Sequence, residues 1–519
     1  MPLFSILTPV YDPPLGVLRA TIQSVLDQSF ADWELILVDD HSPSDAVRAV
    51  LREAAEGDRR IRVRERAVNG GIVAASNDAV AASAGTFLAL LDHDDLLTPT
   101  ALEVMARAIA EHDDVDYLYS DEDKIDSGGN YCDLFCKPDW SPERLRHQMY
   151  TCHLSVLRAS LVHDVGGFHE GFDGSQDHDL VLRVSERARR VVHVREVLYH
   201  WRILPGSGAV AVGEKPYAWE AGQRAVQAHL ERLRIAATAE LGPRPGMYRV
   251  HRSVDPATPV SLIIPTRGTS GSVWGEQRCF VVETVRSAIE KTHMSNVEVV
   301  VVYDEGATPA AALEQVASLA GDRYVPVPYA REFNFSEKCN LGFLASSGRV
   351  VVLLNDDVEA ISDGWLEELI APLIQEADVG MTGARLHFSD MTLQHAGHRY
   401  GDGAWSHAFL GAAMDEEAHF GAMALNREAS GATAACAAIR RDVFEEVGGL
   451  TEELPGNFND IDLSLKITRA GYRIVWMAHA ALFHFESRSR SRIVHEWEVN
   501  TIKRRWGEEP DRDRFVPTG

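Results

Sequence analysis

Short apolar stretches alternate with stretches of helical periodicity along the first hundred residues. Residues 4–13 read as a strand that ends in a proline-containing turn, and residues 33–42 read as a second strand that ends in two aspartates. Between them, residues 14–28 place apolar side chains at helical spacing. The same alternation predicts further strands at 61–65 and 86–91, and further helices at 71–83 and from a cap at Thr98 with Pro99 in its first turn.

The predicted strands are apolar throughout instead of alternating between apolar and polar positions. This pattern is typical of parallel strands that are covered by helices on both faces, which predicts an α/β fold. In such sheets, ligands bind at the carboxyl ends of the strands. The aspartates at 39–40 and 92–95 follow directly after two of these strands. We therefore expect both groups to lie at a ligand-binding edge.

The second half of the chain repeats the order of elements of the first. The stretches at 260–268, 297–306 and 349–360 echo the first, second and aspartate-bearing strands. Later landmarks recur in the same order, and the second half holds about 20 extra residues, which we place within 385–425. Because the copies are of domain size, the sequence predicts two tandem domains, residues 1–255, ending in a helical linker, and residues 256–519, ending in a C-terminal tail.

Composition narrows the class of protein. The chain has 519 residues, 45% hydrophobic and 25% charged, with a net charge of −26. That charge argues against nucleic-acid binding. The N-terminus has no signal-peptide pattern, no apolar run reaches the roughly 18 residues of a membrane span, and the six cysteines form no disulfide framework. We expect a cytoplasmic protein with at most peripheral membrane contact.

One group of residues could be drawn as a zinc site. Cys132, Cys136, His147, Cys152 and His153 lie within 22 positions, but their spacing fits the usual zinc motifs poorly. Free thiols, buried or partly exposed, are the favoured interpretation.

Three carboxylates at the end of one strand need an explanation. Asp92, Asp94 and Asp95 would raise one another's pKa values unless a positive group lay among them. Aspartate is also common in turns and in the first turn of helices, so a purely structural role is the alternative. A divalent cation held by these oxygens is the functional interpretation.

Seven motifs of the first half, taken together, resemble glycosyltransferase family 2 of the GT-A fold. They read TPVY, VDDHS, LDHDD, SDEDK, KPDWSPE, VGGF and QDHDLVLR. The resemblance covers residues 4–205 and, more loosely, 260–490, and its tandem form is similar to bacterial polysaccharide and O-antigen glycosyltransferases. It implies an inverting enzyme that needs Mg²⁺ or Mn²⁺. It also implies a UDP- or dTDP-sugar donor and a glycan or lipid-linked glycan acceptor, at the inner face of a membrane.

The resemblance assigns roles in the first half residue by residue. Asp40 would accept the base N–H of the nucleotide, with Pro9 and Tyr11 lining that slot. Asp92 and Asp94 would hold the metal ion, Asp177 would be the catalytic base, and His200 would reach the metal ion or the diphosphate. The alternatives are a helix N-terminal charge for Asp177 and a core histidine for His200.

The second half departs more from the family pattern. Asp304 matches Asp40, but Tyr303 stands for Asp39 and Arg267 for Tyr11. Asn355 replaces Asp92, which leaves an amide oxygen and Asp357 as the implied metal ligands. The remaining implied roles are the base for Asp460, the later histidine for His484, and a place near the phosphates for Lys338.

Several alternatives stay open at this point. Residues 120–124 either line a sugar pocket or form a solvated acidic loop, and the basic segment 503–507 is more simply a solvated tail than a membrane contact. Both halves can be active and add two linkages, or only the first can be, with a second half that binds glycan. A carbohydrate-binding scaffold without turnover is disfavoured by the retained carboxylates.

Overall fold

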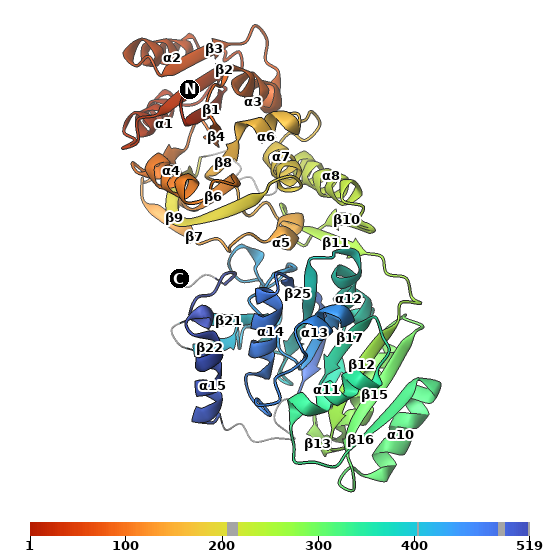
Figure 1. The fold of residues 1–519 in the computed structure, drawn as a ribbon. Coiled ribbons are helices and arrows are strands. Elements are labelled where there is room, and N and C mark those ends of the chain that lie inside the picture. Colours follow the sequence, from red (N-terminus) through yellow and green to blue (C-terminus); the bar gives the residue numbers. More distant parts are fainter. Residues whose placement is uncertain (205–215, 402–403, 486–493, 517–519) are drawn as a thin grey trace. The chain divides into compact units, whose positions relative to one another are not determined.

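The computed structural model describes residues 1–204, 216–401, 404–485 and 494–516 (Figure 1). The chain divides into two compact units, and each is described by itself below. The first comprises residues 1–234 and 238–250, and the second comprises residues 235–237 and 251–518.

The first unit alternates strands and helices from its start, as the hydrophobic pattern predicts. Its strands are β1 (Phe4–Val10), β2 (Trp33–Asp39), β3 (Ile61–Glu65), β4 (Phe87–Leu90), β5 (Leu96–Leu97), β6 (Val115–Ile125), β7 (Tyr131–Phe135), β8 (Ser155–Arg158) and β9 (Arg190–Arg202). Its helices are α1 (Leu15–Leu26), α2 (Asp45–Gly57), α3 (Gly71–Ala82), α4 (Ala101–Glu111), α5 (Pro142–His147), α6 (Ala159–Asp164), α7 (Gln176–Ser185) and α8 (Pro216–Arg232). A separate two-stranded sheet follows, made of β10 (Ala237–Leu241) and β11 (Tyr248–Arg252).

The strands of the first unit form one sheet in the order β3-β2-β1-β4-β8-β6-β9-β5, with β7 on β6. β3, β2, β1 and β4 are parallel, β8 is antiparallel to both neighbours, and β6 and β9 are parallel. Because β1 pairs in register with β2 and β4, the turns that follow Val10, Asp39 and Leu90 meet at one edge. This edge carries the aspartates that the sequence marks as ligand-binding.

The second unit has its own set of elements. Its strands are β12 (Val260–Thr266), β13 (Ser270–Val273), β14 (Glu276–Cys279), β15 (Val297–Asp304), β16 (Tyr324–Tyr329), β17 (Val350–Leu354), β18 (Val358–Ala360), β19 (Val379–His387), β20 (Leu393–His395), β21 (His398–Gly401), β22 (Ala404–His407), β23 (Arg427–Glu428), β24 (Cys436–Arg440) and β25 (Arg473–His484). Its helices are α9 (Phe280–Glu290), α10 (Ala310–Ala320), α11 (Phe335–Ala345), α12 (Trp365–Gln375), α13 (Arg441–Glu446), α14 (Asn459–Arg469) and α15 (Glu496–Trp506), with 3₁₀ turns η1 (Gly321–Arg323), η2 (His419–Gly421) and η3 (Glu509–Asp511).

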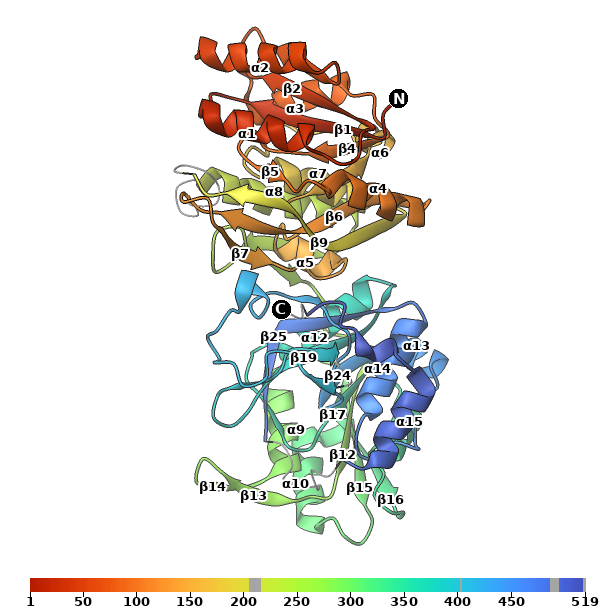
Figure 2. The ribbon, with the colours of Figure 1, turned by 90° about the vertical axis from the view of Figure 1, so that its left-hand side faces the viewer.

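The sheet of the second unit repeats the topology of the first. Its order is β16-β15-β12-β17-β24-β19-β25-β18, with β20 on β19 and β23 on β25. Between β19 and β24 the chain inserts β20, β21, β22, η2 and β23, where the first unit has only β7 and α5 between β6 and β8. The added residues therefore fall in the segment that the sequence repeat indicates. The β13–β14 pair extends from the body of this unit (Figure 2).

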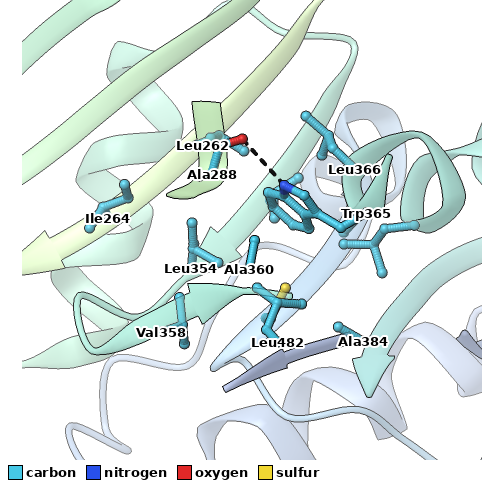
Figure 3. Close-up of a cluster of buried hydrophobic side chains, with 14 of the residues drawn as sticks. Leu262, Ile264, Ala288, Leu354, Val358, Ala360, Trp365, Leu366, Ala384 and Leu482 are labelled. Carbon is cyan, nitrogen blue, oxygen red and sulfur yellow. Dashed lines mark hydrogen bonds between the residues drawn. The ribbon is translucent and has the colours of Figure 1, made fainter. Parts of the chain in front are cut away.

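Helices cover both faces of the second sheet. α9, α10 and α12 bury their apolar residues on one face, and α11, α13 and α14 bury theirs on the other. Trp365 is fully buried among these side chains, and its indole N–H donates to the Ala288 carbonyl at 3.3 Å (Figure 3). A buried aromatic side chain of this size contributes several kcal/mol to folding, provided that its N–H has a partner.

One predicted helix start is wrong by two residues. α4 begins at Ala101 with Thr100 at its N-cap, not at Thr98. The Ala101 N–H donates to the Thr98 carbonyl, so Thr98 begins a turn ahead of the helix. In the second unit, α12 begins at Trp365 after Gly364, which adopts a left-handed φ of 69° that favours glycine.

The structure excludes one of the two interpretations of residues 120–124. They are not a solvated loop but the end of β6, with Asp121 and Glu122 buried. In the basic segment at 503–507, Lys503, Arg504 and Arg505 are exposed at the end of α15, whereas Trp506 is buried with its N–H donating to Asp462 at 2.8 Å. Local charge density could not reveal either arrangement, because the partners are distant in sequence.

Candidate active sites at the strand ends

Asp40 is held firmly at the end of β2. Its carboxylate accepts the backbone N–H groups of Gly70 and Gly71 at 2.9 and 2.8 Å, at the start of α3, and the Arg66 guanidinium at 3.0 Å. A carboxylate at a helix N-terminus is favourably placed. The contacts fix the predicted nucleotide-binding edge beside a half-buried Pro9 and an exposed Tyr11.

The carboxylates after β4 lie in different environments. Asp95 is fully buried and accepts the Tyr199 hydroxyl at 2.6 Å and the Arg202 backbone N–H at 2.7 Å. Asp92 remains half exposed. Burial raises the pKa of Asp94, with Asp92 adding to the effect, and burial raises that of Asp95 well above its usual range. Such carboxyl groups favour a nearby cation.

A histidine that the sequence interpretation placed only in a doubtful zinc group belongs to this cluster. One ligand atom each of Asp92, Asp95 and His153 lie within 4.8 Å of one another. His153 contacts Glu122 at 3.3 Å, and Glu122 accepts the buried Lys137 ammonium at 3.1 Å. Although burial opposes a charged ring, Glu122 raises the pKa of His153 to about 9.

His200 is oriented by a carboxylate on the neighbouring strand. Its Nδ1 contacts the Asp123 carboxylate at 2.5 Å, and β6 and β9 pair these two residues directly. When Nδ1 donates to a carboxylate, Nε2 carries the lone pair. Nε2 is therefore the atom of His200 that can bind a ligand through its lone pair. The ring of Tyr131 lies against the His200 ring, with the two centroids 4.4 Å apart.

Asp177 lies in the first turn of α7, where its side chain accepts the His178 N–H at 2.8 Å. Burial raises the pKa of Asp177. The second aspartate of the same motif, Asp179, has a structural role, because it binds Arg183 at 2.6 Å. Of the two acids, Asp177 is the one whose environment suits proton uptake.

In the second unit, a cavity of about 310 Å³ collects most of the residues that the sequence assigns to its site. They come from five segments that span more than 200 positions of the chain. The lining includes Arg267, Lys338, Asn355, Asp357, Asp460 and His484.

Asp304 is held by two cations at the end of β15. It accepts Arg267 Nε at 2.9 Å and Lys338 Nζ at 2.8 Å, and Lys338 also donates to the Thr266 carbonyl. Lys338 is fully buried. Its ammonium therefore neutralises Asp304, and burial lowers the pKa of Lys338. Asp304 and Asp40 thus occupy matching strand ends but use different cationic partners.

The implied metal ligands of the second unit face one another. His484 Nε2 lies 3.2 Å from Asp357 Oδ1 and accepts from the Asn355 amide at 3.1 Å. His484 Nδ1 contacts Gln394 Oε1 at 2.7 Å, so Nδ1 carries the proton and Nε2 the lone pair. Asn355 Oδ1 is buried without a hydrogen-bond partner in the described structure. Gln394 lies in the inserted segment, and sequence reasoning missed it.

Asp460 lies in the first turn of α14 and lines the same cavity. Its Oδ1 accepts the Ile461 N–H at 2.9 Å, and its Oδ2 lies 3.6 Å from His398 Nε2. Burial alone would raise the pKa of Asp460, but contact with His398 holds it below its usual range. Asp462, the second aspartate of the motif, binds Arg505 and Trp506 and is structural.

The cysteine group does not assemble into a zinc site within the residues that the structure describes. Cys132 is exposed, Cys136 and Cys152 are partly buried, and all three are free thiols. His147 is buried with its Nδ1 against the Tyr248 carbonyl at 2.9 Å. Only Cys152 and His153 come together in a candidate ligand group, with Glu122.

The two units and their sites match known families. Residues 5–163 match glycosyl transferase family 2, and residues 256–508 match glycosyltransferase like family 2. The chain therefore belongs to glycosyltransferase family 2 and carries two such domains in tandem. The predicted fold, two tandem α/β domains of the GT-A type with mostly parallel sheets, is confirmed.

Two relatives match nearly the whole chain. An uncharacterized protein of Sinorhizobium fredii, y4gI, is 43% identical over 97% of this chain and 56% of its own length. The O-antigen biosynthesis protein RfbC of Myxococcus xanthus is 36% identical over 94% of this chain and 38% of its own length. The chain thus spans about half or less of these relatives.

Solved glycosyltransferases resemble part of the chain. TarS of S. aureus in complex with UDP-GlcNAc covers 44% of this chain and 66% of its own, at 20% identity and a TM-score of 0.37. The mannosyltransferase PcManGT of Pyrobaculum calidifontis, in complex with GDP-Man and Mn²⁺, covers 44% of this chain and 64% of its own at 17% identity, with a TM-score of 0.33. None of the helices in the described ranges is long and apolar enough to cross a membrane.

Proposed function

We propose that both units transfer sugars from nucleotide-diphosphate donors, UDP- or dTDP-sugars, to a growing cell-surface polysaccharide. The observation that carries this proposal is the cavity of the second unit. Its lining joins a nucleotide-edge pair, Arg267 and Lys338, to an oxygen-rich pair, Asn355 and Asp357, and to the carboxylate of Asp460. These are the groups that a donor diphosphate, its cation and an acceptor hydroxyl require.

The proposed reaction is a single displacement in each unit. Asp177 or Asp460 takes the proton of the acceptor hydroxyl as its oxygen bonds the anomeric carbon. The bond to the diphosphate breaks with its electron pair, and the sugar configuration inverts. A positioned base typically contributes about 10²–10⁴-fold. One such carboxylate per unit distinguishes these sites from hydrolases, in which two carboxyl groups flank the bond.

The residues of both units fit a hard divalent cation such as Mg²⁺ or Mn²⁺. In the second unit, the lone pair of His484 Nε2 faces Asp357 Oδ1 at 3.2 Å, and two such electron-rich atoms repel unless a cation or proton lies between them. Asn355 Oδ1 is buried and unpartnered beside them. In the first unit, the family resemblance assigns the ion to Asp92, Asp94 and His200, and one carboxylate oxygen of Asp92 also lies within 4.8 Å of ligand atoms of Asp95 and His153. A bound cation would stabilise the charge of the leaving diphosphate.

A donor screen tests the proposal. UDP-, dTDP- and GDP-sugars are offered with Mn²⁺ and an oligosaccharide primer, and released nucleotide diphosphate is measured with and without EDTA. We expect release that depends on one donor class and disappears on chelation. Full turnover in excess EDTA would exclude the metal assignment.

The number of active units is tested by product mass. If the units add different linkages in alternation, Asp94→Ala stalls the glycan after a second-unit addition and Asp357→Ala stalls it after a first-unit addition. Tethering holds the new end near the other site at high effective concentration, which favours alternation. If Asp357→Ala polymerises like wild type, the second unit only binds glycan, the alternative that Asn355 in place of Asp92 favours.

A further inference from the structure

Three imidazoles of the inserted segment gather beside Asp460. His395 ends β20, His398 begins β21 and His407 ends β22. One ring nitrogen of each lies within 4.8 Å of the others. His398 and His407 also line the cavity. In the first unit, the described segment between β6 and β8 holds only β7 and α5, so this group is particular to the second site.

Hydrogen bonds fix the tautomers of two of these rings. The Thr433 backbone N–H donates to His395 Nε2 at 3.2 Å, so a neutral His395 carries its proton on Nδ1. That Nδ1 contacts His407 Nδ1 at 2.5 Å, which must then accept. Burial keeps both rings neutral, because it lowers the pKa of His395 and brings that of His407 to about 4. The proton of His407 is therefore on Nε2.

This pattern argues against a transition metal at the histidines, although three imidazoles are a common ligand set. A metal ion on Nδ1 of His395 would require the proton to move to Nε2. There it would face the Thr433 N–H, and two donors would meet without an acceptor. The group is better described as a hydrogen-bonded relay, in which the Nε2–H of His407 has no hydrogen-bond partner among the residues that the structure describes.

His398 occupies the position between the relay and Asp460. Its Nε2 lies 3.6 Å from Asp460 Oδ2, and its Nδ1 is buried with no hydrogen-bond partner among the described residues. A buried N–H without a partner is costlier than a buried lone pair, so the proton belongs on Nε2, facing the carboxylate. Among the described residues, His407 and Tyr400 are further titratable groups that interact with Asp460.

We propose that these histidines form the acceptor-binding element of the second unit. His398 is a positioning residue that orients Asp460, and His407 offers Nε2–H to an oxygen of the acceptor saccharide. The proposal rests on the proposed transferase function. An acceptor is favoured over the donor because Asp304, Arg267 and Lys338 mark the nucleotide edge, whereas the hydroxyl that loses its proton must lie at Asp460.

The test uses the full chain with the first unit silenced by Asp177→Asn. The acceptor is the oligosaccharide made by the first unit in an Asp460→Asn chain. We expect His407→Phe to raise the acceptor KM about tenfold and leave the donor KM unchanged, which corresponds to one lost hydrogen bond. His293→Gln, at an exposed histidine of the same unit, is the matched control.

The positioning role has a separate signature. His398→Ala should lower kcat about tenfold and move the acid limb of kcat to higher pH, because the pKa of Asp460 rises without its partner. His398→Gln should restore much of kcat, since its amide N–H can face the carboxylate.

Three results would overturn the inference. They are an unchanged acceptor KM in His407→Phe, a His398→Ala limb at the wild-type pH, or one tightly bound transition-metal ion per chain that His395→Ala removes. If the Asp177→Asn chain transfers nothing while the Asp460→Asn chain does, the proposed function of the second unit fails instead. Calorimetric binding of the same oligosaccharide, with and without His407→Phe, then decides whether the histidines bind glycan.

Discussion

The two units place the same chemistry at the same strand ends but differ in charge. At the implied metal site, the first unit has Asp92 and orients His200 with the carboxylate of Asp123, whereas the second has Asn355 and orients His484 with the amide of Gln394. Each replacement removes a negative charge near the expected cation. Metal affinity follows the number of charged ligands, so we expect the proposed cation to bind more tightly in the first unit than in the second.

The proposed bases also differ. Asp177 is shielded by burial, which raises its pKa, whereas Asp460 lies beside His398, which holds its pKa low. A base with a raised pKa takes a proton more readily but is lost earlier as pH falls. We therefore expect the first unit to combine tighter cation binding with the stronger base, and we expect the second to depend on positioning by its inserted histidines.

The largest expected effect comes from neutralising the bases. Asp177→Asn should lower the transfer rate of the first unit, and Asp460→Asn that of the second, each by about 10²–10⁴-fold. The reason is that an amide cannot accept the hydroxyl proton. Nucleotide affinity, measured by calorimetry with Mn²⁺, should stay near wild type. Asp45→Asn, at an exposed ion-paired carboxylate, is the control. A normal transfer rate in either variant would show that the aspartate only stabilises the N-terminus of its helix.

Exchanging the residues of the implied metal sites should reduce the expected difference in Mn²⁺ affinity between the two units. Asp92→Asn should weaken Mn²⁺ binding by the first unit about tenfold, and Asn355→Asp should strengthen it in the second by a similar factor, since each changes one ligand charge. Titration of Mn²⁺ by electron paramagnetic resonance measures both. Equal affinities in wild type and both variants would contradict the charge comparison.

Exchanging the groups that orient the histidines should have a smaller effect. Asp123→Asn and Gln394→Glu change a partner of the ligand and not the ligand itself, and we expect a change in Mn²⁺ affinity of severalfold, down in the first unit and up in the second. Titration of Mn²⁺ by electron paramagnetic resonance also measures this change in affinity. A loss of thermal stability without a change in affinity would show that these side chains only support the fold.

The smallest difference should appear in the pH profiles. Transfer requires an ionised base, so it is lost as pH falls through the pKa of that base. With a raised pKa for Asp177 and a lowered one for Asp460, the acid limb of the first unit should lie at higher pH than that of the second. Each limb is measured as kcat/KM in the chain whose other base is neutralised. Coincident limbs would remove the distinction between the bases.

The sequence alone determined the repeated α/β order, the family and the positions of the implied ligands. These follow from local patterns, because apolar parallel strands end at one edge and carry their functional residues just beyond it. Counting along the chain therefore placed the carboxylates after β4 and β17 and the aspartates in the first turns of α7 and α14. The density of histidines at 395–407 was a further signal that the sequence interpretation did not use.

Tertiary structure alone decided what surrounds those ligands. Arg66 and the start of α3 hold Asp40, Lys338 neutralises Asp304, and His398 lies beside Asp460. Each pair joins residues 26 to 62 positions apart, and Gln394 reaches His484 across 90. Such contacts depend on how the strands pair and where the insertion folds. The protonation states they set are properties of burial and neighbours, which no local pattern encodes.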